Sequence, residues 1–187
     1  MQVAIIFHSS TGNVAALAAT AKDHLEALGH SVSMDALPEL DDLEATRQIH
    51  TRALDHLASA EAVLWDTPGR YGSMSGPLKH FIDQTLPLHQ RGALANKFMT
   101  TFVSTAFNHG GQESTILAFN NIFYHWGAII VPAGVAGEAQ QKPLNGNPYG
   151  ISSVSGAQQA SVPEENHEAM RYLAERLVNI AAGGALQ

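Results

Sequence analysis

The sequence predicts a single α/β domain, residues 1–187, in which helices cover both faces of a doubly wound, five-stranded parallel sheet. Three observations support this. Short apolar runs of strand length alternate with longer segments of helical periodicity. The length of 187 residues suits one domain with a well-buried core. No internal repeat or low-complexity linker divides the chain.

The expected strands are residues 3–7, 31–36, 62–67, 97–105 and 128–133. The expected helices are residues 14–28, 41–58, 76–86, 113–126 and 162–182. Ser161 and Glu164 have the spacing of a capping box at the start of the last helix. Residues 134–161 are rich in Gly, Pro, Asn and Ser and are expected to form a long irregular loop, which is usually functional or an oligomer contact.

Right-handed crossovers place the carboxyl ends of all parallel strands at one edge, where such folds bind ligands. The first loop at this edge follows the apolar run 3–7 and offers hydroxyl and amide groups but no Lys or Arg. A helix N-terminus has unpaired N–H groups and a partial positive charge, so it can bind a phosphate without a cation. The alternative is a turn capped by its own hydroxyls. The candidate residues are Ser9, Ser10, Thr11, Gly12, Asn13 and Val14.

Two further loops follow the third and fourth strands. The third strand leads into T-P-G-R-Y-G-S-M-S-G, residues 67–76, in which glycines allow close approach to a flat ligand and Arg70 and Tyr71 offer a cation and a ring. An ordinary turn before the next helix would explain Ser75 and Gly76 but not Arg70 and Tyr71. The fourth strand leads into S-T-A-F-N-H-G-G-Q-E, residues 104–113, whose alternative interpretation is a glycine-rich helix cap.

Composition and motifs exclude several classes of function. The net charge of −7 and the lack of Lys or Arg runs argue against nucleic-acid binding. No apolar stretch has membrane-spanning length, the first residues do not read as a signal peptide, and the absence of cysteine fits a cytoplasmic protein. No metal site is predicted, because the ten histidines show no ligand spacing, and most of His24, His30, His50, His56 and His167 are expected to be solvated. A P-loop and a G-x-G-x-x-G fingerprint are both missing.

Several motifs in order give the chain a resemblance to the flavodoxin superfamily, and within it to the WrbA-like NAD(P)H:quinone oxidoreductases. They are T-P-G-R-Y-G-S-M-S-G, F-I-D-Q-T, R-G-A-L-A-N-K, G-G-Q-E-S-T-I, G-A-I-I-V-P and N-P-Y-G. The resemblance implies the strand order 2-1-3-4-5, which flavodoxin uses with its FMN. It also implies FMN as cofactor, NADH or NADPH as electron donor, and a quinone as acceptor of two electrons.

The resemblance assigns roles to individual residues. Ser9–Val14 would hold the FMN phosphate, Pro68, Gly69, Arg70, Tyr71 and Gly72 would line the isoalloxazine, and Ser104, Thr105, Ala106, Phe107, Asn108 and Gly110 would form a third wall. Arg70 would steer the anionic donor and stabilise negative charge, and His109 is the second catalytic candidate. Trp126 would contact FMN, while His89 and Tyr149 would lie on the substrate side.

The chain departs from the family pattern at several of these positions. Gly69 stands where the family usually has threonine, and the third loop is one residue longer and carries Phe107, Asn108 and His109 in place of small residues. The pair His125-Trp126 replaces two histidines, and His89 replaces a tryptophan. Two alternatives therefore stay open: a non-enzymatic electron carrier, and a binding module that has lost FMN.

Assembly is the last expectation from the resemblance. The family forms tetramers whose active sites lie where subunits meet. The loop 134–161 and the segment 86–94 are expected to lie at or beside the flavin edge, with too little regular apolar pattern to pack on the chain's own core. A neighbouring subunit would then cover Leu86, Leu88, Leu144 and Tyr149. The alternative is a monomer with mobile loops.

Overall fold

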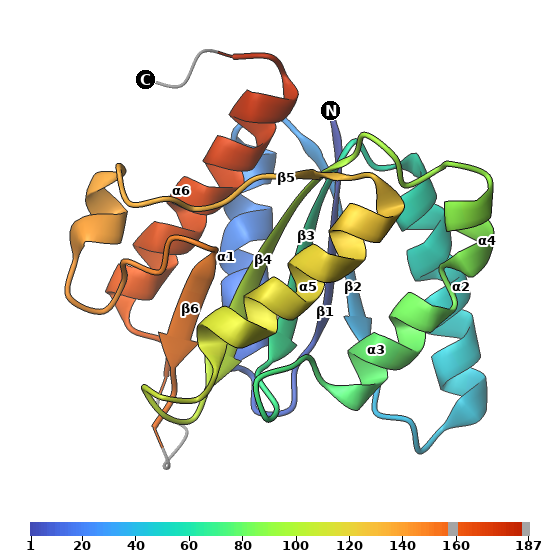
Figure 1. The fold of residues 1–187 in the computed structure, drawn as a ribbon, viewed down its shortest axis with the longest axis horizontal. Coiled ribbons are helices and arrows are strands. Elements are labelled where there is room, and N and C mark those ends of the chain that lie inside the picture. The colour runs from blue at the N-terminus through green and yellow to red at the C-terminus, as the bar shows by residue number, and fades with distance from the viewer. Residues whose placement is uncertain (157–160, 185–187) are drawn as a thin grey trace.

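The computed structural model describes residues 1–156 and 161–184 (Figure 1). The strands are β1 Gln2–His8, β2 Ser31–Leu37, β3 Ala62–Pro68, β4 Phe98–Thr105, β5 Ile129–Ile130 and β6 Ile151–Val154. The helices are α1 Asn13–Ala27, α2 Leu43–Ser59, α3 Gly76–Asp83, α4 Leu86–Gln90, α5 Gln112–Trp126 and α6 Glu164–Ala181, with a short 3₁₀ helix, η1, at Glu138–Gln141.

The sheet has the order β2-β1-β3-β4-β5 and all of its pairings are parallel, so the predicted order 2-1-3-4-5 is confirmed. Its outer position beside β4 is shared by two short strands. β5 pairs with Phe98 and Met99, and β6 pairs with β4 from Phe102 to Thr105. The expectation of an irregular segment over 134–161 is therefore wrong for residues 151–154, which complete the sheet.

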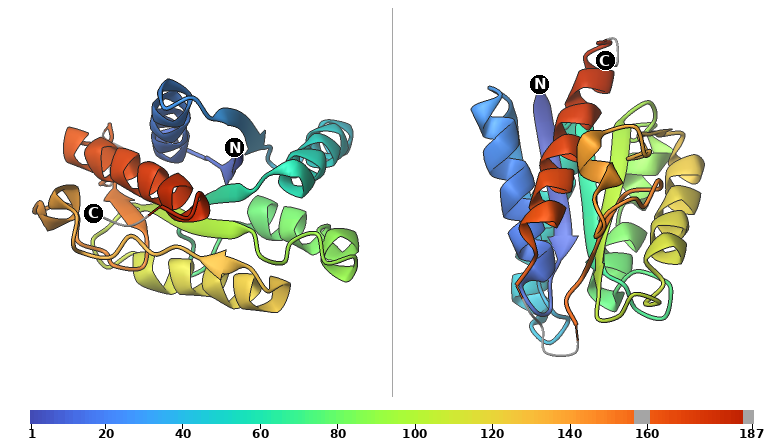
Figure 2. Two further views of the ribbon diagram at one scale, coloured as in Figure 1. Left: turned by 90° about the horizontal axis from the view of Figure 1, so that it is seen from above. Right: turned by 90° about the vertical axis from the view of Figure 1, so that its left-hand side faces the viewer.

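Helices cover both faces of this sheet, as predicted (Figure 2). α1 and α6 pack on one face, and α2, α3 and α5 pack on the other. β1, β3 and β4 contribute side chains alternately to the two cores because successive strand residues point to opposite faces. The carboxyl ends of the strands meet at one edge, the lower edge in Figure 1.

The segment after α3 differs from its prediction. The expected helix 76–86 is two helices, since α3 ends at Asp83 and α4 begins at Leu86 with a proline in its first turn. Proline lacks the N–H that would continue a helix and restricts the residue before it. Leu88 and Leu94 are buried in the chain's own core, and α4 lies toward the edge opposite the three loops. The expectation that 86–94 lies at the flavin edge and cannot pack on its own core is wrong.

The capping box expected at the start of the last helix does not form. α6 begins at Glu164 after Pro163, and no side chain caps its N-terminus. Pro163 stands at the cap position, where its fixed φ leads into the helix, and Ser161 lies two residues before it.

The long loop also packs on its own chain. The buried side chain of Gln140 donates hydrogen bonds to the carbonyls of Gly134 and Asn147.

The expectation of a solvated histidine is wrong at position 50. His50 is 1% exposed and lies on the buried face of α2. Its ring stands 5.2 Å from that of Phe81 and 5.6 Å from that of His80, measured between ring centroids. Neither ring nitrogen of His50 has a hydrogen-bond partner among the described residues.

Candidate functional site

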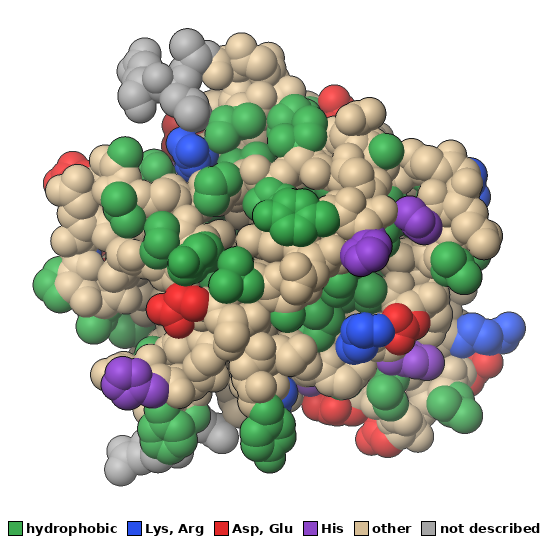
Figure 3. All heavy atoms as spheres, viewed as in Figure 1, with side chains coloured by type: hydrophobic (Ala, Val, Ile, Leu, Met, Phe, Trp, Pro, Cys, Tyr) green, Lys and Arg blue, Asp and Glu red, His purple; other side chains and the backbone are tan. Residues whose placement is uncertain are grey.

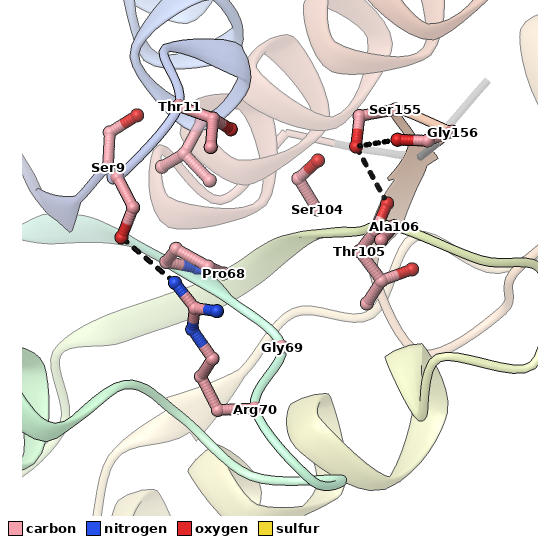
Figure 4. A pocket seen from close by; sticks show the side chains of 12 residues that line it. Ser9, Thr11, Pro68, Gly69, Arg70, Ser104, Thr105, Ala106, Ser155 and Gly156 are labelled. Carbon is pink, nitrogen blue, oxygen red and sulfur yellow. Dashed lines mark hydrogen bonds between the residues drawn. The ribbon is translucent and has the colours of Figure 1, made fainter. Parts of the chain in front are cut away.

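The loops after β1, β3 and β4 meet at the carboxyl edge of the sheet and enclose a pocket of about 170 Å³ (Figure 4). The segment that follows β6 forms a further wall. The lining residues are Ser9, Ser10, Thr11, Val14, Pro68, Gly69, Arg70, Ser104, Thr105, Ala106, Ser155 and Gly156. Hydroxyl groups dominate this lining, and its charged side chain is a single arginine.

The first loop ends at Gly12, whose left-handed φ of 92° turns the chain into α1. The hydroxyl of Ser9 accepts hydrogen bonds from the amides of Gly12 and Ala15, both at 3.2 Å. The loop is therefore partly capped by its own hydroxyl, as the alternative interpretation proposes. Among the described residues, the amides of Asn13 and Val14 have no hydrogen-bond partner, so they remain free to bind a ligand.

The second loop is a tight turn that presents Arg70. The amide of Arg70 donates to the carbonyl of Ser73 at 2.8 Å, and the amide of Ser73 donates back at 3.0 Å. The residues between them, Tyr71 and Gly72, both have positive φ, as in a type I′ turn. Tyr71 consequently projects into solvent. The guanidinium of Arg70 donates to Ser10 Oγ at 3.1 Å, which joins the second loop to the first (Figure 4).

The third loop is organised around the carbonyl oxygen of Phe107. This oxygen accepts hydrogen bonds from the Gly110 amide at 2.9 Å, Thr105 Oγ1 at 2.9 Å and Gln112 Nε2 at 3.0 Å. With its backbone fixed in this way, Phe107 leaves its ring 64% exposed at the rim. Gly111, in the left-handed region, opens α5, so the helix-cap interpretation also describes part of this loop.

Ser155 and Gly156 line the pocket, and the sequence interpretation missed them. The amide of Ser155 donates to the Thr105 carbonyl at 2.9 Å, and Ser153 Oγ donates to Ser104 Oγ at 3.0 Å. These bonds hold the end of β6 against the end of β4. The only sequence signal was the S-S-V-S run at 152–155, which is too short and too polar to stand out as a buried strand.

A family described as NADPH-dependent FMN reductase matches residues 1–142. The chain belongs to this family. Proteins named NAD(P)H dehydrogenase (quinone) from Geotalea uraniireducens strain Rf4 and Geobacter sulfurreducens are each 34% identical over 199 residues, covering 97% of this chain and 98% of theirs. The predicted resemblance to this group of flavodoxin-like proteins is confirmed.

Solved structures show the same fold. A flavodoxin, WrbA-like protein from Agrobacterium tumefaciens superposes with a TM-score of 0.70 at 15% identity, covering 98% of this chain and 99% of the other. The flavodoxin from Streptococcus pneumoniae TIGR4 gives a TM-score of 0.61 at 19% identity, covering 96% and 99%.

Three predicted site residues of this FMN reductase family member lie outside the three loops that form the pocket. Trp126 ends α5, which begins beside the third loop and has 15 residues, a length of roughly 20 Å. It is 7% exposed and packs on Trp65. The prediction that Trp126 contacts a flavin is therefore not supported within one chain. His89 lies on α4, and Tyr149 precedes β6 at the side of the sheet.

Trp126 and His89 do share a second, separate pocket of about 410 Å³. It lies between α3, α4 and α5, and its lining residues are Lys79, Ile82, Asp83, Thr85, Leu86, His89, Ile122, His125 and Trp126. Of the rest of the predicted set, Gly12 and Asn13 follow Thr11 at the start of α1 and do not line the first pocket. Tyr71, Gly72, Phe107, Asn108, His109 and Gly110 belong to the other two loops without lining the first pocket.

The first pocket fits a phosphate ester better than a metal ion. The amides of Asn13 and Val14 are unpartnered, and the buried Nδ2 of Asn13 has no partner in the part of the chain that the structure describes. Arg70 forms no ion pair within residues 1–156 and 161–184, so its positive charge is available to an anionic ligand. All these groups are donors, which suit an anion. Over the same ranges no three His, Asp or Glu side chains gather as a metal site. No described helix has the length and apolarity to cross a bilayer.

Proposed function

We propose that this protein is an FMN-dependent NAD(P)H:quinone oxidoreductase. The observation that carries the proposal is the pocket itself, at the carboxyl edge of a flavodoxin-like sheet. Several hydroxyls meet there with a helix N-terminus and an arginine, and among the described residues the helix has free amides and the arginine has no ion pair. The family match and the names of the relatives support the same activity.

In this proposal the residues of the three loops bind and orient. Ser9–Val14 hold the FMN phosphate, the turn 68–72 and the loop 104–110 flank the flavin ring, and FMN supplies the two-electron chemistry. Arg70 lies between the first and second loops, where its charge attracts the anionic NADH or NADPH and stabilises negative charge on the reacting oxygens. His109, exposed on the third loop, is the second catalytic candidate.

The proposal includes a homo-oligomer, with a tetramer favoured, in the cytoplasm, and quinone as the acceptor. The first pocket of about 170 Å³ is smaller than the roughly 300–1,000 Å³ of most small-molecule sites, so one chain supplies only part of the enclosure. A neighbouring copy that brings its second pocket to this edge would add His89 to the substrate side and Trp126 to the residues that contact FMN. Tyr149, 42% exposed, is available for the same role.

Replacement of Thr11 by Asp tests the phosphate placement. The new carboxylate would face the phosphate dianion and should weaken FMN binding by at least tenfold, because like charges repel strongly at close range. The matched control is Thr51→Asp, which introduces the same charge on the exposed face of α2. Fluorescence titration with FMN measures both. Equal affinity of the two variants would contradict the placement.

A second candidate function is a non-enzymatic electron carrier, which the net charge of −7 favours because acidic carriers associate with basic partners. Reduction of the FMN-loaded protein by NADH or NADPH separates the two functions. Rapid reduction and turnover with a quinone supports the oxidoreductase. Slow direct reduction with fast exchange from a partner reductase would support the carrier.

A further inference from the structure

A buried carboxyl group, that of Asp66, lies beneath the floor of the first pocket. Asp66 is the fifth residue of β3 and is 0% exposed. Two positions later on the same strand, Pro68 lines the pocket. Side chains two apart on a strand share a face and lie roughly 7 Å apart, so the Asp66 side chain sits one step below the pocket wall.

The sheet register also places Asp66 next to the first loop, the proposed phosphate site. Its partners on the neighbouring strands are Phe7 on β1 and Phe102 on β4. Two residues after Phe7 the chain reaches Ser9, the first residue of the phosphate loop, and two residues after Phe102 it reaches Ser104. Asp66 therefore lies below both polar walls of the pocket.

No hydrogen-bond donor side chain or positive charge in the described surroundings would stabilise a negative charge on this carboxyl group. Neither oxygen has a hydrogen-bond partner, and the cross-strand neighbours are two phenylalanines. No buried residue of α1 or α6, the helices on this face, is titratable. Two pairs with titratable groups link these helices: His167 bonds Thr20, and His24 bonds Glu175 at their partly exposed surface. Burial raises the pKa of Asp66 well above its ordinary value, and the nearby backbone amide of Thr67 opposes this only in part.

We propose that Asp66 is a neutral carboxylic acid that links the occupancy of the phosphate site to a proton. When Asp66 is protonated, the pocket above it attracts the phosphate through its amides and hydroxyls. When Asp66 loses its proton, a negative charge appears beneath the phosphate within the screening length of physiological salt. The ionised form should bind FMN more weakly, and bound FMN should in turn hold the proton on Asp66.

This inference rests on the proposed function, because it requires that the protein binds FMN. Different results would contradict the inference and the proposed function. If the chain binds no FMN at neutral pH, the proposed function fails. If FMN binds with the same affinity at every pH, only the role of Asp66 fails. Asp66 is a positioning group in this scheme, since its charge acts through the pocket wall and it does not line the pocket.

The test is the dissociation constant of FMN between pH 7 and pH 10, a range in which the phosphate stays a dianion. One proton lost from Asp66 should raise the constant by up to about tenfold per pH unit over the range where Asp66 ionises. Asp66→Asn, which cannot ionise, should show no such rise. The matched control Asp23→Asn, an exposed position on α1, should behave like the wild type. Riboflavin, which has no phosphate, should bind with little dependence on Asp66.

Three outcomes would overturn the inference: a flat wild-type profile, the same rise in Asp66→Asn, or an equal rise for riboflavin. If Asp66→Asn does not fold, carbon-13 NMR of the wild-type carboxyl groups replaces it. A neutral Asp66 at pH 7 whose titration midpoint moves upward with FMN would support the inference. A carboxylate already ionised at pH 7 in the free protein would overturn it.

Discussion

Gly69 and Thr105 share a space too small for another carbon atom. A Cβ atom on Gly69 would lie 2.7 Å from Cγ2 of Thr105, 3.3 Å from Oγ1 of Thr115 and 3.4 Å from Cγ1 of Val103. Thr105 cannot rotate away freely, because its hydroxyl donates to the Phe107 carbonyl at 2.9 Å. The glycine at 69 thus lets the second and third loops of the pocket approach one another, and the amide of Gly69 bonds the Ser104 carbonyl at 2.9 Å.

Gly69→Ala should therefore destabilise the protein, by about 1–3 kcal/mol, since one added methyl group overpacks the contact. Urea unfolding measures the effect. The control Gly76→Ala places the same methyl group where, apart from its own helix backbone and chain neighbours, no atom of the described residues lies within 4 Å, and it should be neutral or slightly stabilising. Adding Thr105→Ser to Gly69→Ala removes Cγ2 and should recover most of the loss. No recovery in the double variant would contradict the contact.

Arg70→Ala should raise the KM for NADH or NADPH and leave the FMN content nearly unchanged. The lost interaction is one charge-assisted contact, worth roughly 1.5–3 kcal/mol, which corresponds to about a tenfold or greater loss of kcat/KM. Steady-state kinetics and the visible absorbance of the purified variant measure the two quantities. Loss of FMN with normal turnover per remaining flavin would assign Arg70 to cofactor binding instead.

The buried His50 should make the protein sensitive to acid. Burial lowers the pKa of His50, the side chain of Gln84 opposes this in part, and His80 lowers it further. The unfolded chain then binds a proton at a higher pH than the folded chain. As the pH falls below about 6.5, the free energy of unfolding should decrease until the folded protein also takes up the proton.

His50→Leu should flatten this acid limb, because leucine stays apolar beside Phe81 at every pH. Urea unfolding at pH 7.5, 6.5 and 5.5 measures the slope. His109→Gln, a change at an exposed histidine, should leave the limb as it is in the wild type. Parallel acid limbs in the wild type and His50→Leu would show that another group causes the sensitivity.

The sequence predicted the central sheet because its strands carry strong local patterns. β1 and β3 are nearly continuous buried apolar runs, and β4 is buried over seven of its eight residues, as parallel strands covered on both faces require.

β5 was expected over 128–133 and forms over two residues. The amide of Val131 still donates to Met99, but Pro132 has no N–H to continue the ladder. β6 was missed because its partner on β4 lies about fifty residues earlier in the chain.

The site was predictable to the extent that topology determines it. Strand order alone brings the loops after β1, β3 and β4 together, so the hydroxyl loop, Arg70 and Ser104 meet in one pocket. The motif that contains Trp126 did not determine where this residue lies in space. Its position in the sequence did not reveal that the length of α5 separates it from the third loop. Asp66 shows another limit, because the sequence alone does not reveal whether a carboxyl group inside an apolar strand has a hydrogen-bond partner.

The final prediction concerns assembly. Exposed apolar side chains lie over the helices α3–α5 and near the second pocket, including Leu86 at 55% and Tyr124 at 69%, and Figure 3 shows apolar groups across this face of the molecule. Leu144, at 55%, lies on the other side near η1. Exposed apolar side chains that gather on one face are typical of an interaction surface. We expect light scattering at micromolar concentration to give a mass near four times that of the 19.9 kDa chain.

Leu86→Glu should shift this mass toward the monomer, because a charge would be buried at the centre of the proposed contact. It should also lower quinone turnover, since the neighbour would no longer complete the substrate side. Leu43→Glu is the matched control: Leu43 is 79% exposed at the start of α2 and lies outside both pockets. A wild-type mass near 19.9 kDa would contradict the assembly and would favour the electron carrier, which needs no neighbour to close its site.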